Sequence, residues 1–341
     1  MIYRSRAPLR LGLGGGGTDI PSYALEYEGV VLNATIDMYV YCTLTLQDPE
    51  QNIVFHAQDR EEYVSLPLSN NCESESLPLH AITYNYMINV YNKGIPIPLV
   101  VETRSEVAAG SGLGSSSALV VAMIQVFVEY LNLPLDRYDI AQVAIQIERV
   151  EATQEGGLQD QYAATFGGVN FMHFLKDEAV ISPLVLDPDV LVELEYRTLL
   201  YYTGVSRDST AIIKEQSSNV SSDHNQALDA MHRLKAIAYE MKEALLKGDI
   251  DKFAQILRES WLIKKQTADR ITNASIESII QAAFAHGAQA AKISGAGGGG
   301  FLMLIVQENK RDDLARILEG LGGELRRWHF TSKGAQSWST K

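Results

Sequence analysis

Residues 110–118 read Gly-Ser-Gly-Leu-Gly-Ser-Ser-Ser-Ala, between a β-rich run at 99–104 and an apolar segment at 115–131. The apolar segment has almost no polar face, so it is predicted to be a buried helix. Glycines leave backbone N–H groups free to converge, and a helix N-terminus adds about half a positive charge. An ordinary serine cap would need one serine, whereas three follow three glycines here. The stretch therefore predicts a phosphate-binding loop.

This loop differs from the common nucleotide-binding fingerprints. No lysine precedes its serines, so it is not a Walker A loop, and it is not the Gly-x-Gly-x-x-Gly turn of a dinucleotide-binding unit. Its serine hydroxyls can bond phosphate oxygens or complete a Mg²⁺ shell.

Two further glycine-rich stretches lie far from the first along the chain. Residues 6–19 contain four consecutive glycines followed by Thr18 and Asp19, which suits either a pocket wall or a flexible turn. Residues 292–301 carry glycine at five of the six positions 295–300, between two apolar runs. A hairpin needs only one or two glycines, so this density predicts close packing against a ligand or another loop.

Carboxylates that could do chemistry lie between these stretches. Glu148 borders the apolar face of a predicted helix, 136–151, and Asp160 follows a Gly-Gly break. A carboxylate beside a phosphate site can hold Mg²⁺ or accept a proton from an alcohol. Glu151 and Glu155 are better explained as solvated charges.

A separate segment, 202–209, leaves a predicted strand through Gly204 and enters a predicted helix. Ser206 and Arg207 there suit a second phosphate site, since arginine offers a bidentate fork. A strand-to-helix turn with a polar cap explains the segment equally well.

The overall composition excludes several classes of protein. A chain of 341 residues is long enough for two domains, and a net charge of −13 gives no basic surface for nucleic acid. The two cysteines, Cys42 and Cys72, make neither a disulfide scaffold nor a Cys-rich zinc site and suit a reducing cytoplasm. The histidines show no metal-ligand spacing. No apolar run is long enough to span a bilayer, so no membrane contact is expected.

Hydrophobic periodicity predicts an α+β chain whose two domains meet around residues 155–170. Alternation over 30–46 indicates one long strand or two consecutive ones. Further strands are expected at 53–57, 62–66, 99–104, 169–174, 192–203, 290–294 and 301–306. Helices are expected at 115–131, 136–151, 225–247, 250–269, 276–286 and 310–321.

Taken together, the three glycine-rich stretches resemble the three motifs of the GHMP kinases (galactokinase, homoserine kinase, mevalonate kinase, phosphomevalonate kinase). Residues 110–118 resemble the family's Pro-x-x-x-Gly-Leu-Ser/Gly-Ser-Ser-Ala loop, with Val107 or Ala108 where proline is usual. Residues 292–300 resemble its Lys-x-Thr/Ser-Gly-Ala-Gly-Gly-Gly motif. The order and spacing of the motifs match along almost the entire chain.

The N-terminal motif indicates a sugar kinase within that family. Galactokinases begin Gly-Arg-x-Asn-x-x-Gly-Glu-His-Thr-Asp, and Arg10 precedes Thr18 by the same eight residues, although glycines replace Gly-Glu-His. Leu-Gln-Asp-Gln at 158–161 resembles the galactokinase Met-Asp-Gln, whose Asp acts as the base, and Glu148 stands at the place of the family's Mg²⁺ carboxylate. The whole pattern is most similar to the bacterial D-glycero-D-manno-heptose 7-phosphate kinases, which phosphorylate an anomeric hydroxyl.

This resemblance implies the fold and the role of each site residue. It implies a β-rich nucleotide-binding domain at 1–168 and a ferredoxin-like domain with extra helices at 169–341, with the site in the cleft between them. ATP and Mg²⁺ are the implied cofactors, and a sugar or sugar phosphate is the implied acceptor for a monomer or homodimer. The resemblance assigns catalysis to Asp160 and to Arg10, which keeps Asp160 ionised, and it assigns Mg²⁺ binding to Ser116, Ser117 and Glu148. The implied nucleotide-binding residues are Gly110, Ser111, Gly112, Leu113, Gly114, Ser115, Ser116 and Ser117. The implied substrate-binding residues are Gly16, Gly17, Thr18, Asp19, Ser206, Arg207, Gly297 and Gly298.

Three alternatives remain open from the sequence. The first is a kinase of the same fold that acts on a free fucose-like or galactose-like sugar, and the second is one that acts on mevalonate, although the register of Arg10, Thr18 and Asp19 favours a sugar. A nucleotide-binding regulator that has lost catalysis is the third, and intact Glu148 and Asp160 speak against it.

Overall fold

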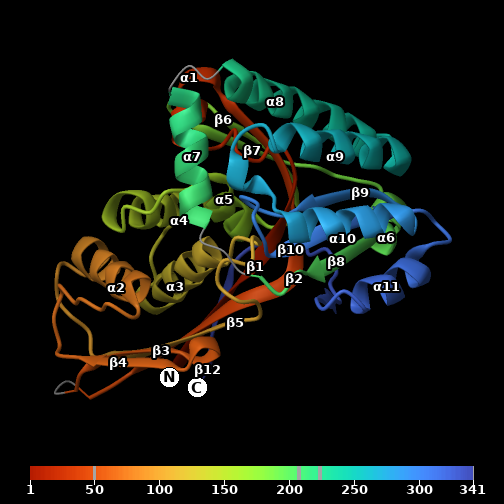
Figure 1. Ribbon diagram of the computed structural model, residues 1–341. Helices are drawn as coiled ribbons and strands as arrows, with labels where there is room; N and C mark the ends of the chain where they lie inside the picture. The colour runs from red at the N-terminus through yellow and green to blue at the C-terminus, as the bar shows by residue number, and fades with distance from the viewer. Residues whose placement is uncertain (49–50, 206–208, 222–224, 341) are drawn as a thin grey trace.

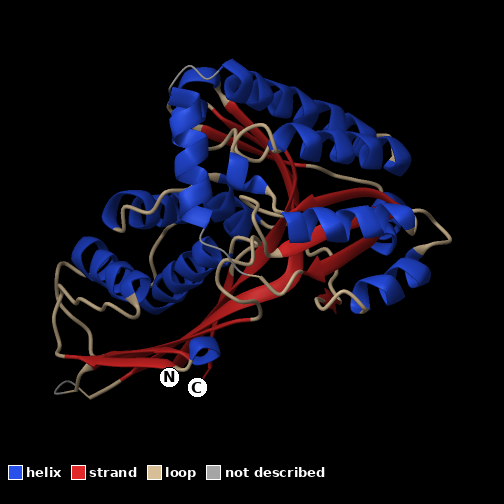
Figure 2. Ribbon diagram, in the orientation of Figure 1, coloured by secondary structure: helices blue, strands red, loops and turns tan. Residues whose placement is uncertain are grey.

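A computed structural model describes residues 1–48, 51–205, 209–221 and 225–340 of the chain. Two sheets with helices against them make up this part of the molecule (Figures 1 and 2). The larger sheet has eight strands and the smaller has four. No described helix is both long and apolar enough to cross a membrane.

The larger sheet is built on two long antiparallel strands, β1 (Ile2–Gly14) and β2 (Gly29–Leu46). Its main path runs β12-β1-β2-β5-β3-β4, and β2 also pairs with β6, which pairs with β7. The remaining strands are β3 (Ile53–Ala57), β4 (Glu62–Leu66), β5 (Leu99–Ser105), β6 (Val169–Phe174), β7 (Ala179–Pro183) and β12 (Gln336–Thr340). The alternation at 30–46 therefore marks a single strand that exchanges partners along its length.

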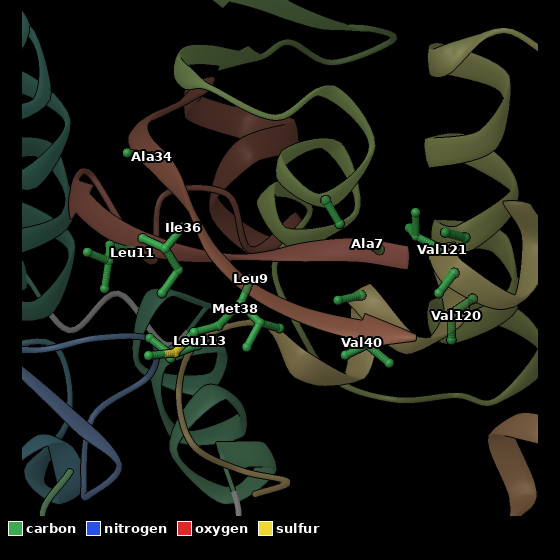
Figure 3. Close-up of a cluster of buried hydrophobic side chains, with 14 of the residues drawn as sticks. Ala7, Leu9, Leu11, Ala34, Ile36, Met38, Val40, Leu113, Val120 and Val121 are labelled. Carbon is green, nitrogen blue, oxygen red and sulfur yellow. The ribbon is translucent and has the colours of Figure 1, made fainter. Parts of the chain in front are cut away.

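The core of this part lies between the long strands and α3 (Ser115–Leu131). Figure 3 shows Leu9 of β1, Ile36 of β2 and Val121 of α3 among the apolar side chains of this core. The other helical segments here are α1 (Pro21–Tyr27), η1 (Gln58–Arg60), α2 (Pro78–Tyr91), α4 (Arg137–Ile145), a π-helical segment η2 (Gln146–Glu151) and α5 (Gln159–Phe166). Because α3 packs on both long strands, its N-terminus is fixed relative to β1.

The smaller sheet has the strand order β11-β8-β10-β9, with every neighbour antiparallel. Counted along the chain this order is 4-1-3-2, the ferredoxin-like arrangement that was expected. Its strands are β8 (Thr198–Tyr202), β9 (Ala288–Ile293), β10 (Phe301–Val306) and β11 (Glu324–Arg326). The helices after residue 183 are α6 (Pro188–Arg197), α7 (Ser209–Ser221), α8 (Asn225–Leu246), α9 (Ile250–Lys264), η3 (Asp269–Ile271), α10 (Ala274–Ala285) and α11 (Arg311–Glu319). The extra helices lie between β8 and β9, and α8 packs beside α9 (Figure 1).

Two predicted segments were wrong in detail. The strand expected at 192–203 is a helix up to Arg197 and a strand only from Thr198. The helix expected at 250–269 ends at Lys264, and a short 3-10 turn follows. The glycine-rich stretch at 6–19 begins inside β1, so only its end is a turn.

The larger sheet draws on both ends of the chain. β6 and β7 follow residue 168 and still pair with β2 and with each other, and β12 pairs with β1 near the C-terminus. The division at 168/169 stays a prediction, and it does not coincide with a boundary between the two sheets.

Candidate active site

The three glycine-rich stretches meet at one cleft, which has an empty volume of about 970 Å³ counted to its open mouth. Its walls come from β1 and the turn after it, the loop before α3, the start of α5, helices α7 and α9, and the loop after β9. The lining residues are Arg10, Gly12, Gly16, Gly17, Asp19, Ile20, Gly110, Gly112, Gly114, Ser115, Ser116, Gly157, Gln159, Asp160, Ser209, Ile213, Gln216, Lys264, Lys292, Gly295, Ala296, Gly297 and Gly299.

The loop before α3 has the conformation that its glycines permit. Gly110, Gly112 and Gly114 all have positive φ, at 73°, 83° and 78°. Residues other than glycine rarely adopt this region. The loop therefore presents mainly backbone atoms, and it lies at the N-terminus of a 17-residue helix. Such a surface favours an anion.

The loop after β9 packs so closely against the loop before α3 that several positions have room only for glycine. A Cβ on Gly112 would stand 2.4 Å from the carbonyl oxygen of Ser294, and one on Gly300 would stand 2.2 Å from that of Ser111. The amide of Phe301 donates to the carbonyl of Ser111 at 3.0 Å. The two loops therefore interlock through backbone contacts, and between the two expected explanations the structure favours packing against another loop. Gly297 still lines the cleft, whereas Gly298 is absent from its lining.

Arg10 and Asp160 form a bidentate ion pair at the cleft. Nε and Nη2 of Arg10 donate to the two carboxylate oxygens of Asp160 at 2.7 and 2.8 Å, and Nη1 donates to the carbonyl of Gly112 at 2.5 Å. The arginine side chain is 7% exposed and the aspartate side chain 22%, so the pair is sheltered but reachable. A Cβ on Gly114 would lie 3.2 Å from the carboxyl group, which places Asp160 against the glycine-rich loop before α3.

Glu148 is the buried carboxylate that was expected near the serines. It lies in the π-helical segment, is 1% exposed, and accepts hydrogen bonds from Ser116 Oγ at 3.0 Å and Gln161 Nε2 at 2.5 Å. π-Helical turns often occur at functional sites. Ser117 is 3% exposed, so of the two predicted metal-binding serines Ser116 is the exposed one.

Thr18 and Asp19, both expected to bind substrate, occupy different positions in the turn after β1. Thr18 is fully buried, and its hydroxyl bonds the backbone of Gly15 and Val30, so it stabilises the turn and does not line the cleft. Asp19 does line the cleft, and its carboxylate accepts from the amide of Gly17 at 3.1 Å and from the amide and side chain of Gln159 at 3.1 and 3.2 Å.

Two buried lysines complete the cleft, and the sequence did not assign a role to either. Lys264 donates to the carbonyls of Gly295 at 2.8 Å and Gly16 at 3.4 Å, and burial lowers its pKa to about 8. Lys292 donates to the carbonyls of Gly12 and Leu13 at 2.9 and 3.0 Å, and burial, with Lys264 nearby, lowers its pKa well below the usual value. Lys292 is part of the third glycine-rich motif, so the sequence could have indicated it. Lys264 is one of two adjacent lysines at the end of an amphipathic helix, and nothing in the local sequence distinguishes it as a site residue.

Ser206 and Arg207, the predicted second phosphate site, lie outside the described residues. Among the residues that the structure describes, no group of three or more His, Cys, Asp or Glu side chains could hold a metal ion. An ion at Glu148 would therefore need hydroxyl, phosphate or water oxygens to complete its shell.

The chain matches known proteins over nearly its whole length. Residues 80–168 match the GHMP kinases N terminal domain and residues 241–323 match the GHMP kinases C terminal. It is 41% identical to a D-glycero-alpha-D-manno-heptose 7-phosphate kinase of Campylobacter jejuni, covering 98% of each chain. It is 28% identical to an L-fucokinase/L-fucose-1-P guanylyltransferase of Bacteroides fragilis, over 90% of this chain and 35% of that protein.

The structure also matches a crystal structure described as a D-glycero-D-manno-heptose 1-phosphate kinase from Bacteroides thetaiotaomicron. The TM-score is 0.85 at 36% identity, covering 99% of each chain. The motifs, the cleft and these matches agree, and the chain belongs to the GHMP kinase family.

Proposed function

We propose that this kinase transfers the γ-phosphoryl group of ATP to the anomeric hydroxyl of a heptose phosphate, D-glycero-D-manno-heptose 7-phosphate. The observation that carries the proposal is the bidentate pair of Arg10 and Asp160, held at 2.7 and 2.8 Å against the phosphate loop. A positioned carboxylate beside a phosphate site is what transfer to an alcohol requires.

The loop at 110–117 is assigned to the β- and γ-phosphates of ATP. Its left-handed glycines leave the backbone without covering side chains, and α3 directs its positive end at the loop. The chain carries a net charge of −13, so this local field has to hold the nucleotide without help from a general positive surface.

The donors around Glu148 fit Mg²⁺. A buried carboxylate and the Ser116 hydroxyl 3.0 Å from it are hard oxygen ligands, and Mg²⁺ commonly takes one or two carboxylates together with phosphates and waters. Glu148 and Ser116 are thus the proposed protein ligands, with Ser117 next in the chain. When bound, the ion would neutralise charge that develops on the phosphates.

Asp160 is assigned the role of base. Arg10 uses one lone pair on each carboxylate oxygen, and an ionised carboxylate offers about four acceptor sites, so acceptor sites remain for the attacking hydroxyl. Arg10 also fixes the orientation of the carboxylate, because a bidentate pair sets both distance and plane. An anomeric hydroxyl is more acidic than an ordinary alcohol, which eases its deprotonation.

Support for a heptose phosphate comes from the 41% identical relative of Campylobacter jejuni, which is named a heptose 7-phosphate kinase. A free fucose-like sugar is the second candidate, because an L-fucokinase is also a relative at 28% identity. Arg207 remains the sequence's candidate for the acceptor phosphate, and a cytoplasmic location and a monomeric or homodimeric state stay predictions.

A coupled ADP-release assay tests the proposal. The panel is D-glycero-D-manno-heptose 7-phosphate, the free heptose, mannose 6-phosphate, L-fucose, galactose and mevalonate, with phosphorus NMR to identify the phosphorylated position. A clear preference in kcat/KM for the heptose 7-phosphate, with a new anomeric phosphate, is expected. Equal kcat/KM for the heptose and its 7-phosphate would overturn the sugar phosphate assignment and favour a free-sugar kinase.

A further inference from the structure

Three cationic side chains line the described cleft, and they differ in how fully their donors are used. Arg10 is engaged by Asp160 and by the carbonyl of Gly112. Lys292 donates to two carbonyls at 2.9 and 3.0 Å. Lys264 makes one short bond, 2.8 Å to Gly295, and one long bond, 3.4 Å to Gly16. An ammonium has three donors, so each lysine retains one, and Lys264, whose second bond is long, retains the greater donor capacity where it lines the cleft.

Gln159 offers the complementary feature. It lines the same cleft and is 8% exposed, and its amide nitrogen donates to Asp19 at 3.2 Å. Its carbonyl oxygen, Oε1, is buried and accepts no hydrogen bond from any described residue. A buried acceptor without a partner is costly in a folded protein, and such groups often mark a site where a ligand supplies the donor.

The two groups lie on the same wall of the cleft. A Cβ on Gly16 would stand 3.7 Å from Lys264 Nζ and 3.9 Å from Gln159 Nε2. Asp19 binds Gln159 directly and is the carboxylate that acts most strongly on Lys264. The acceptor Oε1 of Gln159 would stand 4.0 Å from a Cβ on Gly12, which lines the cleft as Gly16 does. The donor on Lys264 and the acceptor on Gln159 therefore lie beside two glycines of the same wall.

We propose that Gln159 and Lys264 together recognise the acceptor as a polyol: Oε1 of Gln159 accepts a hydrogen bond from one sugar hydroxyl, and Nζ of Lys264 donates to a neighbouring sugar oxygen. The proposal rests on the sugar kinase function proposed above and names the residues that read the sugar ring.

The charges on this wall favour hydroxyl groups over the acceptor's phosphate as the ligand. The charge of Asp19 raises the pKa of Lys264, so the carboxylate is near enough to offset the ammonium and to disfavour an anion. Donors and acceptors in alternation are also what a run of sugar hydroxyls needs, since each hydroxyl donates once and accepts twice.

The test uses Gln159→Met and Lys264→Met in the full chain, with Lys265→Met as the matched control. Lys265 is the next residue and pairs with Glu277 at 3.1 Å outside the cleft lining. Acceptor KM should rise about three- to tenfold in Gln159→Met and about ten- to a hundredfold in Lys264→Met, the scales of neutral and charge-assisted hydrogen bonds. KM for ATP should change less than twofold in both, and Lys265→Met should match the wild type.

A series of single-deoxy acceptors adds a readout that a structural role would not move. One deoxy position should weaken binding to the wild type but bring no further loss in Gln159→Met, because the hydrogen bond is already absent. Calorimetric titration of the acceptor without ATP separates binding from turnover. Thermal melting checks the fold, and Lys264→Gln, which keeps a donor without the charge, serves if Lys264→Met does not fold.

The outcomes separate this inference from the proposed function. If the wild type phosphorylates the heptose phosphate and both variants bind it as tightly as the wild type does, the recognition pair is wrong and the function stands. A rise in KM for ATP would place Lys264 on the nucleotide side, and a fall in kcat with acceptor KM unchanged would mean that it acts in the transition state. Either result would overturn the proposal. A wild type that phosphorylates no sugar on the panel overturns both.

Discussion

At the scale of single residues, the pair of Arg10 and Asp160 joins β1 to the first turn of α5, 150 residues apart in the chain. Asp160→Asn keeps the shape of the side chain but removes its ability to take a proton. We expect kcat to fall by about 10²-fold or more, with ATP binding unchanged, because that is the scale of positioned acid–base catalysis. Steady-state and nucleotide-binding measurements check this. A near-wild-type kcat would show that Asp160 is not the base.

Glu148 and Glu151 lie on the same π-helical segment and give a matched pair for the metal. Glu148 is buried beside Ser116, whereas Glu151 is exposed and accepts a hydrogen bond from Gln146. Glu148→Gln should shift the Mg²⁺ titration of activity to clearly higher concentration, since the amide lacks the charge that attracts the ion. Glu151→Gln should titrate like the wild type. Indistinguishable titrations for the two variants would remove Glu148 from the metal site.

Lys264 predicts a pH dependence. Its pKa is lowered to about 8, chiefly by burial; the charge of Arg10 also lowers the pKa, and the charges of Asp19 and Asp160 raise it. Lys292, also buried, is the neighbouring cation. As pH rises through 8 the ammonium of the free enzyme loses its proton and its charge, so acceptor kcat/KM should fall on the alkaline side with an apparent pKa near 8. The profile of Lys264→Met should lack this limb, and an identical limb in the variant would assign it to another group.

Several site residues were predictable and others were not, for a physical reason. Arg10, Glu148 and Asp160 stand at fixed offsets within motifs, so the sequence alone predicted that they act together, and the structure brings Arg10 to Asp160 and Glu148 to Ser116. Lys264 is one of two adjacent lysines, and only the fold decides that the first is 3% exposed while the second pairs with Glu277. Burial of a charge depends on tertiary contacts that leave no local pattern.

At the scale of elements, prediction succeeded where local pattern and burial agree. Helix α3 begins and ends at the predicted residues, 115 and 131, because an all-round apolar surface is satisfied only inside the core. The segment at 192–203 failed because Val192, Leu194 and Tyr196 alternate with charged residues as in a strand. The missed signal is Asp187, whose side chain caps the helix ahead of Pro188 at the first position.

The interlocking of the two glycine-rich loops predicts different costs for two similar substitutions. Gly112 and Gly322 have nearly the same positive φ, 83° and 85°. A methyl group at Gly112 would meet the carbonyl of Ser294 at 2.4 Å, whereas one at Gly322 would meet nothing within 4 Å. Both alanine variants should lose about 1–2 kcal/mol to backbone strain, and Gly112→Ala should lose more and raise the KM for ATP. Urea unfolding and ATP kinetics check this, and equal losses would mean that the loop contact is dispensable.

At the scale of the whole molecule, the chain crosses between its two sheets more than once. After β7 it forms the ferredoxin-like sheet and then returns as β12 to pair with β1, which places the two ends of the chain side by side (Figure 1). The glycine-rich loop before α3 is held from one side by that helix and from the other by the loop after β9. No window of sequence predicts such a return, because strand pairing between residues 2–6 and 336–340 is set by the closure of the whole fold.

Removal of residues 336–341 tests what this return contributes. Ile2 to Arg6 of β1 pair with Thr340 to Gln336, and Ser337 also bonds Glu129 of α3 at 3.0 Å, so the deletion leaves β1 as an open edge with a side-chain partner of α3 missing. The distal half of β1, which carries Arg10, keeps its pairing with β2, and the backbone amide of Arg10 still donates a hydrogen bond to the carbonyl of Leu113 at 3.0 Å. We therefore expect the shortened protein to melt several degrees below the wild type and to aggregate more through the exposed edge. Its kcat at about 20–25 °C should stay close to that of the wild type. Thermal melting with parallel kinetics measures both, and a loss of activity without a loss of stability would show that β12 positions the site directly and does not act through the sheet.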